Sequence, residues 1–212
     1  MRILDDADLS FLPRPEELEL NCRIFAALDA VIESDWQYRY YSYDPTWGPA
    51  SRMASLRTGS GDHWHAVFER GQAFVKGFTR DVIGPSGPKG WPASLFADAV
   101  PTPLQEHLNE PAFYVEETGF CLWWDEGWRG VALEIAGANT DLDRLRDVAA
   151  GAGRYAEWAC EYYEVKLDAA EIAPLWRGGS LSRALVLRLV AEADLDSLDS
   201  ELRSLGLSIA SE

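Results

Sequence analysis

The clearest pattern of apolar and polar positions near the start of the chain predicts a helix over residues 15–34. Ile24, Leu28 and Val31 recur at spacings of four and three residues, which places them on one helical face. Pro15 suits the first turn of a helix, because its missing N–H would have no partner there. Acidic residues follow Pro15 and complement the positive end of the helix dipole. The pattern therefore predicts one amphipathic helix near the N-terminus.

A strict alternation follows this helix and predicts a strand. The alternating residues are Trp36, Gln37, Tyr38, Arg39, Tyr40 and Tyr41. The turn signal Asp44-Pro45 then ends the strand. Next come three short runs, MASLRT, HWHAVFE and QAFVKGF, which are separated by the turn sequences GSGD and RG. Residues 36–78 therefore predict an antiparallel meander of about four strands.

A second pair of strands is indicated by GFCLWW and WRGVALEI, which flank an Asp-Glu-Gly turn. Between the two sheet regions, residues 79–92 are rich in Gly and Pro and predict a loop. The segments SLFADAV and TPLQEHLN predict two short helical pieces after that loop. With this hairpin, the expected sheet has about four to six strands.

Helical patterns dominate the chain after residue 137, at residues 141–150, 155–164, 180–193 and 197–205. Strands and helices are thus segregated along the sequence, which is typical of the α+β class. We predict a single α+β domain over residues 1–212, with the helical region 141–212 packed on the sheet. A subdomain boundary near 137–140 is the alternative.

The chain is strongly acidic, with 19 Lys and Arg against 35 Asp and Glu and a net charge of -16. Nucleic acid and anionic membranes would repel such a protein, so we expect neither as a partner. No apolar stretch approaches the roughly 18–20 residues of a membrane helix, and no leader pattern opens the chain. The three widely spaced cysteines fit reduced thiols. These features predict a cytoplasmic protein without a cofactor, and they permit a basic protein partner.

Three segments, YRYYSYDPTWG, the turn Ser60-Gly61-Asp62 and AFVKGF, together resemble a family of uncharacterised bacterial proteins. The tail segments RYAEWACEYYEVKLD and ELRSLGL fit the same resemblance, which spans most of the chain. It is a likeness of aromatic and glycine spacing, and it implies no activity and no catalytic residue. In its small size and acidity the chain also resembles the immunity proteins that neutralise bacterial toxins, which is a likeness of composition.

The sharpest chemical candidate is a metal site at His63 and His65. Residues two apart on a strand share a face, so both imidazoles would point the same way, with Glu69 as a third candidate ligand. This HxHx₃E string resembles the first half of the cupin metal motif. It departs from that motif because Arg57 stands where a glycine is expected, and the second half is missing. The alternative is that both histidines face solvent, while the core is filled by Trp64, Ala66 and Phe68.

A second candidate is an aromatic surface, because 12% of the residues are Phe, Trp or Tyr. Adjacent Trp123 and Trp124 must face opposite sides of a strand, so one of them belongs to the less buried face. Aromatic side chains suit a protein interface, a ligand cleft or the edge of a core. The candidate surface with its acidic rim consists of Trp36, Tyr38, Tyr41, Trp123, Trp124, Asp125, Glu126 and Trp128. The alternative is that the C-terminal helices cover these rings.

Three hypotheses for function follow. The first is a non-enzymatic binding protein with a role like that of immunity proteins, whose acidic aromatic surface binds a basic protein partner. The second is a metal-dependent enzyme that uses His63 and His65. The third is a small-ligand binding domain lined by Trp36, Tyr38 and Trp123. Lys76, between apolar neighbours, is expected at a sheet edge or with its ammonium reaching solvent.

Overall fold

The computed structural model describes residues 1–80, 91–133, 142–190 and 194–210. Within them, one seven-stranded sheet forms the centre of the fold, in the order β1-β7-β6-β5-β4-β3-β2. All neighbouring strands run antiparallel. The strands are β1 (Arg2–Leu4), β2 (Tyr41–Asp44), β3 (Ser51–Arg57), β4 (His63–Glu69), β5 (Gln72–Phe78), β6 (Phe120–Trp124) and β7 (Trp128–Ala132).

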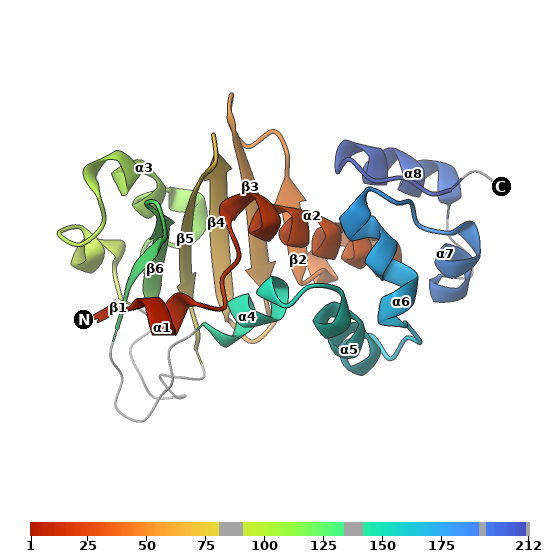
Figure 1. The fold of residues 1–212 in the computed structure, drawn as a ribbon, viewed down its shortest axis with the longest axis horizontal. Helices are drawn as coiled ribbons and strands as arrows, with labels where there is room; N and C mark the ends of the chain where they lie inside the picture. The colour runs from red at the N-terminus through yellow and green to blue at the C-terminus, as the bar shows by residue number, and fades with distance from the viewer. Residues whose placement is uncertain (81–90, 134–141, 191–193, 211–212) are drawn as a thin grey trace.

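The α-helices are α1 (Asp6–Leu9), α2 (Pro15–Ile32), α3 (Gln105–Leu108), α4 (Asp143–Ala149), α5 (Ala152–Tyr162), α6 (Ala169–Ile172), α7 (Arg183–Leu189) and α8 (Leu195–Ser204). Short 3₁₀ turns are η1 (Trp36–Tyr38), η2 (Ala93–Phe96), η3 (Thr102–Leu104), η4 (Pro111–Phe113) and η5 (Ala173–Arg177). Helix α2 crosses one face of the sheet, and the C-terminal helices α5–α8 gather at the end where β2 lies (Figure 1). No helix in the described part of the chain is long and apolar enough to cross a membrane.

The first face of the sheet carries the main core. Phe25 and Leu28 of α2 belong to the same buried cluster as Trp64 and Phe68 of β4. Helix α2 buries a continuous apolar face because its apolar positions recur at helical spacing. Pro15 occupies its first turn, where the missing N–H needs no partner. The main core also includes residues of α4, α5, α7 and α8, so the C-terminal helices share it.

The second face of the sheet is covered as well, by the residues between β5 and β6. Phe96, Leu108 and other residues of this cover pack against Phe74, Cys121 and Val131 of the sheet. We call residues 93–118, which contain η2, η3, α3 and η4, the cover segment. Because both faces are covered, polar residues on the central strands are shielded from solvent.

The α+β class, the N-terminal helix, the meander and the β6–β7 hairpin are confirmed. The hairpin between β4 and β5 turns at Arg70 and Gly71, which both have positive φ angles (50° and 78°), as a type I′ turn requires. Helix α2 ends at Ile32, and α4, α5, α7 and α8 fall within or close to the predicted helical ranges. The proposed boundary near 137–140 lies outside the described residues.

The predicted strand over Trp36 and Tyr38 is wrong. These residues form the 3₁₀ turn η1, because the Asp35 carboxylate accepts a hydrogen bond from the Gln37 amide (3.0 Å) and turns the chain. Strand β2 begins only at Tyr41. The seventh strand, β1, was not predicted; it pairs with β7 at the edge of the sheet.

Candidate functional site

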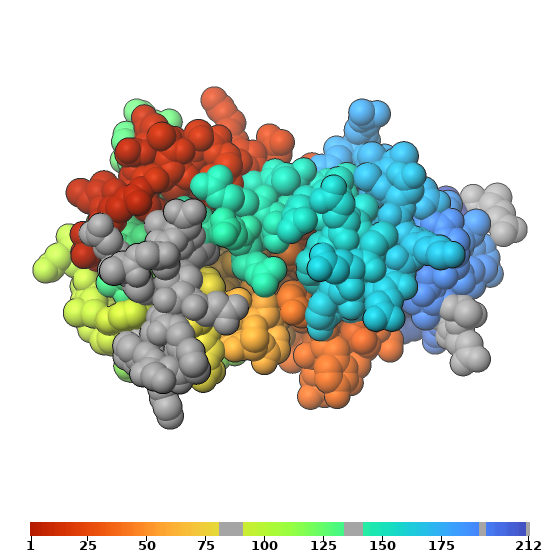
Figure 2. Space-filling model, turned by 90° about the horizontal axis from the view of Figure 1, so that it is seen from below, coloured from red at the N-terminus to blue at the C-terminus, as the bar shows by residue number. Residues whose placement is uncertain are grey.

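Large aromatic side chains are exposed on η1 and at the end of α5. Trp36 is 54% exposed and Tyr38 is 66% exposed, while Tyr162 of α5 is 46% exposed. Tyr40 joins the two elements, because its ring centroid lies 4.4 Å from that of Tyr162. In Figure 2 the orange segment that follows α2 lies directly against the cyan surface of α5. We call Trp36, Tyr38, Tyr40 and Tyr162 the aromatic surface.

The aromatic surface rests on packed rings. Trp158 of α5, which is 8% exposed, stacks on Tyr162 with 5.5 Å between ring centroids and an interplanar angle of 9°. Tyr40 also packs on Trp158, at 5.3 Å. Because the rings beneath are fixed in the core, Tyr40 and Tyr162 are held in position.

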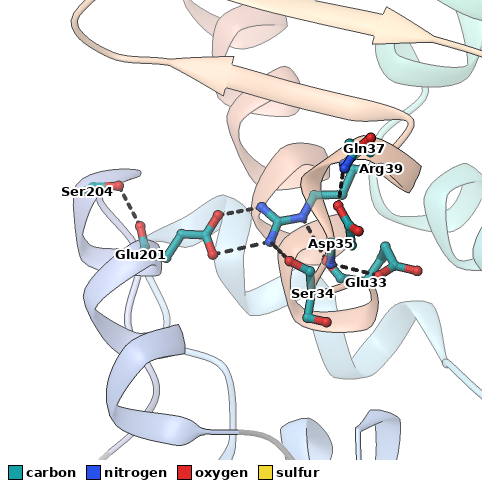
Figure 3. Close-up of polar contacts among 7 residues, drawn as sticks. All are labelled: Glu33, Ser34, Asp35, Gln37, Arg39, Glu201 and Ser204. Carbon is teal, nitrogen blue, oxygen red and sulfur yellow. Dashed lines mark hydrogen bonds and ion pairs between the residues drawn. The ribbon is translucent and has the colours of Figure 1, made fainter.

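Arg39 holds η1 in place (Figure 3). Its side chain is only 8% exposed, and its Nε donates to the Glu33 carbonyl (2.7 Å). Its Nη2 donates to the Ser34 carbonyl (3.1 Å), and both terminal nitrogens bind the Glu201 carboxylate of α8. One guanidinium thus joins the end of α2, the turn η1 and α8. The planar guanidinium with its several N–H donors fixes the relative orientation of these elements better than the single ammonium of a lysine would.

Charges of both signs surround the aromatic surface. The Arg57 guanidinium lies over the Trp36 ring, 4.2 Å from its centroid, in a cation–π contact. Asp35 precedes Trp36, and Glu161 and Glu164 flank Tyr162; all three carboxylates are exposed. A groove of about 170 Å³ beside η1 is lined by Trp36, Tyr43, Asp44, Glu201 and other residues. Cations are thus favoured by the ring faces and by the nearby carboxylates.

Tyr41 does not belong to this surface, although the sequence predicted it there. It is 2% exposed and packs on Phe25 and Trp158 in the main core. Its backbone amide donates to the buried carboxylate of Asp29 (2.9 Å), which also accepts from the Tyr155 hydroxyl (2.8 Å). Tyr41 is the first residue of β2, where it pairs with Leu56 and points to the face of the sheet that α2 covers, whereas Trp36 and Tyr38 lie on the turn before the strand.

Burial raises the pKa of Asp29 to about 7, although its hydrogen bonds favour the charged form and act in the opposite direction. The carboxyl group is fully buried in α2 and ties that helix to β2 and α5. Asp29 is therefore part of the framework beneath the aromatic surface.

The rings of the β6–β7 hairpin do not form the predicted exposed surface. Trp128 is 7% exposed, and its indole N–H donates to the Pro13 carbonyl (2.6 Å). Trp124 packs edge-on against Trp128, with 5.7 Å between ring centroids, and is half-buried. Trp123 is half-buried on the opposite face, where it packs against the cover segment. The adjacent tryptophans do face opposite sides, but both sides are covered.

Asp125 and Glu126 lie at the exposed turn of this hairpin. Strands β5, β4 and β3 separate β6 from β2, which places the two regions about 19 Å apart across the sheet. The structure therefore brings Trp36 and Tyr38 together, but not with the predicted residues of the hairpin.

His63 and His65 share a face of β4, as predicted, with 5.7 Å between ring centroids. The prediction that this face meets solvent is wrong, because the cover segment buries both rings to 5% and 4% exposure. His65 stacks on Phe113 at 4.6 Å, and His63 packs on Tyr114 at 4.6 Å. Burial lowers the pKa of His63 to about 4 and that of His65 to about 3, so both imidazoles are neutral at pH 7.

The metal site at His63 and His65 stays a prediction, and Glu69 does not join it as a third ligand. Glu69 lies at the far end of β4, opposite Gln72 of β5. Among the described residues, no group of three or more His, Cys, Asp or Glu side chains could hold a metal ion. The three cysteines are free thiols, of which Cys22 and Cys121 are buried and Cys160 is half-buried.

The sequence did not predict that Arg39 anchors η1 or that Tyr162 belongs to the aromatic surface. Tyr162 carried a usable signal, because Tyr162 and Tyr163 are adjacent on a predicted helix and point about 100° apart. Only one of two such neighbours can face the core directly. Arg39 carried no signal, since its partner Glu201 lies on α8, far along the chain.

No protein-family model, curated protein or solved structure matches this chain. The resemblance to a family of uncharacterised bacterial proteins therefore stays a prediction, and the fold and surface of the chain itself must carry the argument on function.

Proposed function

We propose that this chain is a non-enzymatic binding protein whose aromatic surface and flanking carboxylates bind a basic protein partner. The observation that carries the proposal is the exposure of Trp36 and Tyr38 on a turn that Arg39 anchors at several points. Exposed rings on a fixed base lose little conformational freedom when they bind, and Trp and Tyr are enriched among residues that dominate interface energies.

The charge of the chain supports a basic partner. A net charge of -16 attracts a cationic protein at long range and accelerates encounter. At short range, the exposed carboxylates of Asp35, Glu161 and Glu164 flank rings that can receive Lys or Arg side chains. A role like that of the toxin-neutralising immunity proteins agrees with this chemistry.

The proposal is tested by capture from the native lysate with the wild-type protein and with the double variant Trp36→Ala and Tyr38→Ala. The control is Leu95→Ala, because Leu95 is also exposed (51%) but lies on the cover segment. Quantitative mass spectrometry then compares the captured proteins at low and high ionic strength.

We expect a basic protein that the wild type and the Leu95→Ala variant capture equally, and that the double variant loses. High ionic strength should weaken the capture, since long-range attraction is screened. Capture that is unchanged by the double substitution, or a captured set without a basic protein, would contradict the proposal.

A further inference from the structure

A row of polar side chains runs across the second face of the sheet, beneath the cover segment. Directly paired residues on five neighbouring strands point to this face: Ser42, Ser55, His65, Lys76 and Cys121. We call these five residues the polar row. Four of them are at most 5% exposed, and Ser42 is half-buried. The polar row lies in the middle of a sheet, where apolar residues would be the ordinary choice.

Lys76 is the residue least expected in this position. It lies on the central strand β5 and is fully buried, so the prediction of an edge or solvent-reaching lysine is wrong. Its ammonium has only two long contacts, to the carbonyls of Leu108 (3.5 Å) and Tyr114 (3.4 Å). Among the described residues, no carboxylate pairs with it. The exposed carboxylate of Glu116 favours the charged form of Lys76 electrostatically but does not pair with it. A buried charge without a paired counter-charge is costly, which calls for a specific reason to retain it.

Other polar atoms close to Lys76 also lack partners. Within the described chain, no hydrogen bond is made by His65 Nδ1 or by His63 Nε2, and both atoms are buried. The buried Ser42 hydroxyl also lacks a partner, but β2 lies three strands from β5, about 14 Å away. Buried polar groups in proteins are nearly always hydrogen-bonded, and exceptions point to a bound water, ion or ligand. Burial also keeps both imidazoles neutral and lowers the pKa of Lys76 to about 8, so the row carries one positive charge at pH 7.

We infer that Lys76, His65 and His63 form a binding site for a small oxyanion, a carboxylate or a phosphate, with Lys76 as its counter-charge and the two imidazoles as hydrogen-bond donors. The inference is independent of the aromatic surface. An oxyanion accepts hydrogen bonds from all these groups and neutralises the buried ammonium. A metal cation at the same place would be repelled by that ammonium.

Tyr114 provides the route of entry. It is 46% exposed, its ring packs on His63, and its φ angle of 50° is a left-handed conformation that non-glycine residues seldom adopt. Movement of this one side chain would uncover the His63 ring, on which it packs, and leave the polar row beneath the cover segment. A ligand that enters there would replace the two long carbonyl contacts of Lys76 with a charged partner.

Thermal unfolding at matched ionic strength tests the inference, with inorganic phosphate in one arm, acetate in a second and chloride as the reference. The variants are Lys76→Met, which removes the charge but keeps an apolar chain, and the control Lys166→Met, at an exposed lysine. A specific anion at 100 times its Kd should raise the wild-type Tm by about 5–10 °C. The arm that responds distinguishes a phosphate from a carboxylate ligand.

The Lys166→Met control should keep this rise and Lys76→Met should lose it. In chloride alone, Lys76→Met should have a higher Tm than the wild type, because the buried unpaired charge is gone. A rise that persists in Lys76→Met, or no rise beyond chloride in either arm, overturns the inference and leaves bound water as the partner of these atoms.

Nitrogen NMR of the histidine side chains keeps the test decisive if Lys76→Met fails to fold. The chain has three histidines, so their resonances can be assigned by substitution. The responding anion should shift the side-chain nitrogens of His65 in the wild-type protein and leave those of His107 in place. Unchanged His65 resonances at anion concentrations that raise the Tm would overturn the inference.

Discussion

Substitution of Arg39 by alanine tests whether η1 is held as the structure indicates. The change removes a guanidinium that is 8% exposed and donates to two backbone carbonyls and to Glu201. A hydrogen bond from a charged donor contributes about 1.5–3 kcal/mol when it is shielded. The Glu201 pair contributes less, about 1 kcal/mol, because the glutamate side chain is 42% exposed.

The two backbone hydrogen bonds share one guanidinium, and water replaces Arg39 at the exposed end of α2, so their contributions do not add in full. The free energy of unfolding should therefore fall by about 2–4 kcal/mol in Arg39→Ala. Urea unfolding followed by tryptophan fluorescence measures it, and an unchanged m-value would show that the native fold is retained. The matched control is Arg203→Ala, because Arg203 also pairs with an acid on α8 (Asp199, 2.6 Å) but is 65% exposed. That control should lose no more than about 0.5 kcal/mol. Equal losses in the two variants would refute the anchoring role of Arg39.

Three further predictions concern the framework and the histidines. Asp29→Asn should remove a pH dependence of stability. The pKa of this carboxyl is about 7 in the folded protein against 3.8 for an ordinary Asp, so its contribution to stability falls as pH rises from about 4 to 7. Urea unfolding across that range should show this fall as the difference in unfolding free energy between wild type and variant. Gly77→Ala should destabilise by about 1–3 kcal/mol, because its Cβ would lie 2.9 Å from Trp64 Cβ, whereas Gly153→Ala, with open space around it, should not destabilise. If His63 and His65 hold a metal, metal analysis of the purified protein should find a bound ion that His63→Ala and His65→Ala both lose. A metal content below about a tenth of an equivalent, unchanged by these substitutions, would end that hypothesis.

The elements that could be predicted from sequence are those with a local signal. Pro15 and the apolar face behind it define α2, and the Asp-Glu-Gly turn defines the β6–β7 hairpin. Strand β1 has three residues, too few for an alternating pattern, and its partner β7 lies far along the chain. Trp36 and Tyr38 show a true alternation, but the Asp35 side chain competes for the backbone and turns it.

The candidate sites depended on what covers each face of the sheet. Lys76 and His65 carry polar side chains on central strands, which suggested contact with solvent, and only the packing of the cover segment shows that they are buried. Trp128 likewise looked like an exposed ring beside acids, yet its indole hydrogen-bonds Pro13, far away in sequence. Trp36 and Tyr38 are exposed, as the hypothesis of an aromatic surface requires, but they lie on a 3₁₀ turn and not on the predicted strand.

Hydrogen–deuterium exchange on the complex with the captured basic protein tests the central claim most directly. We expect slower exchange at the backbone amides of residues 36–40 and at the end of α5 when the partner is bound, with no change in the cover segment. Protection confined to other parts of the chain, with residues 36–40 exchanging as in the unbound protein, would contradict that claim.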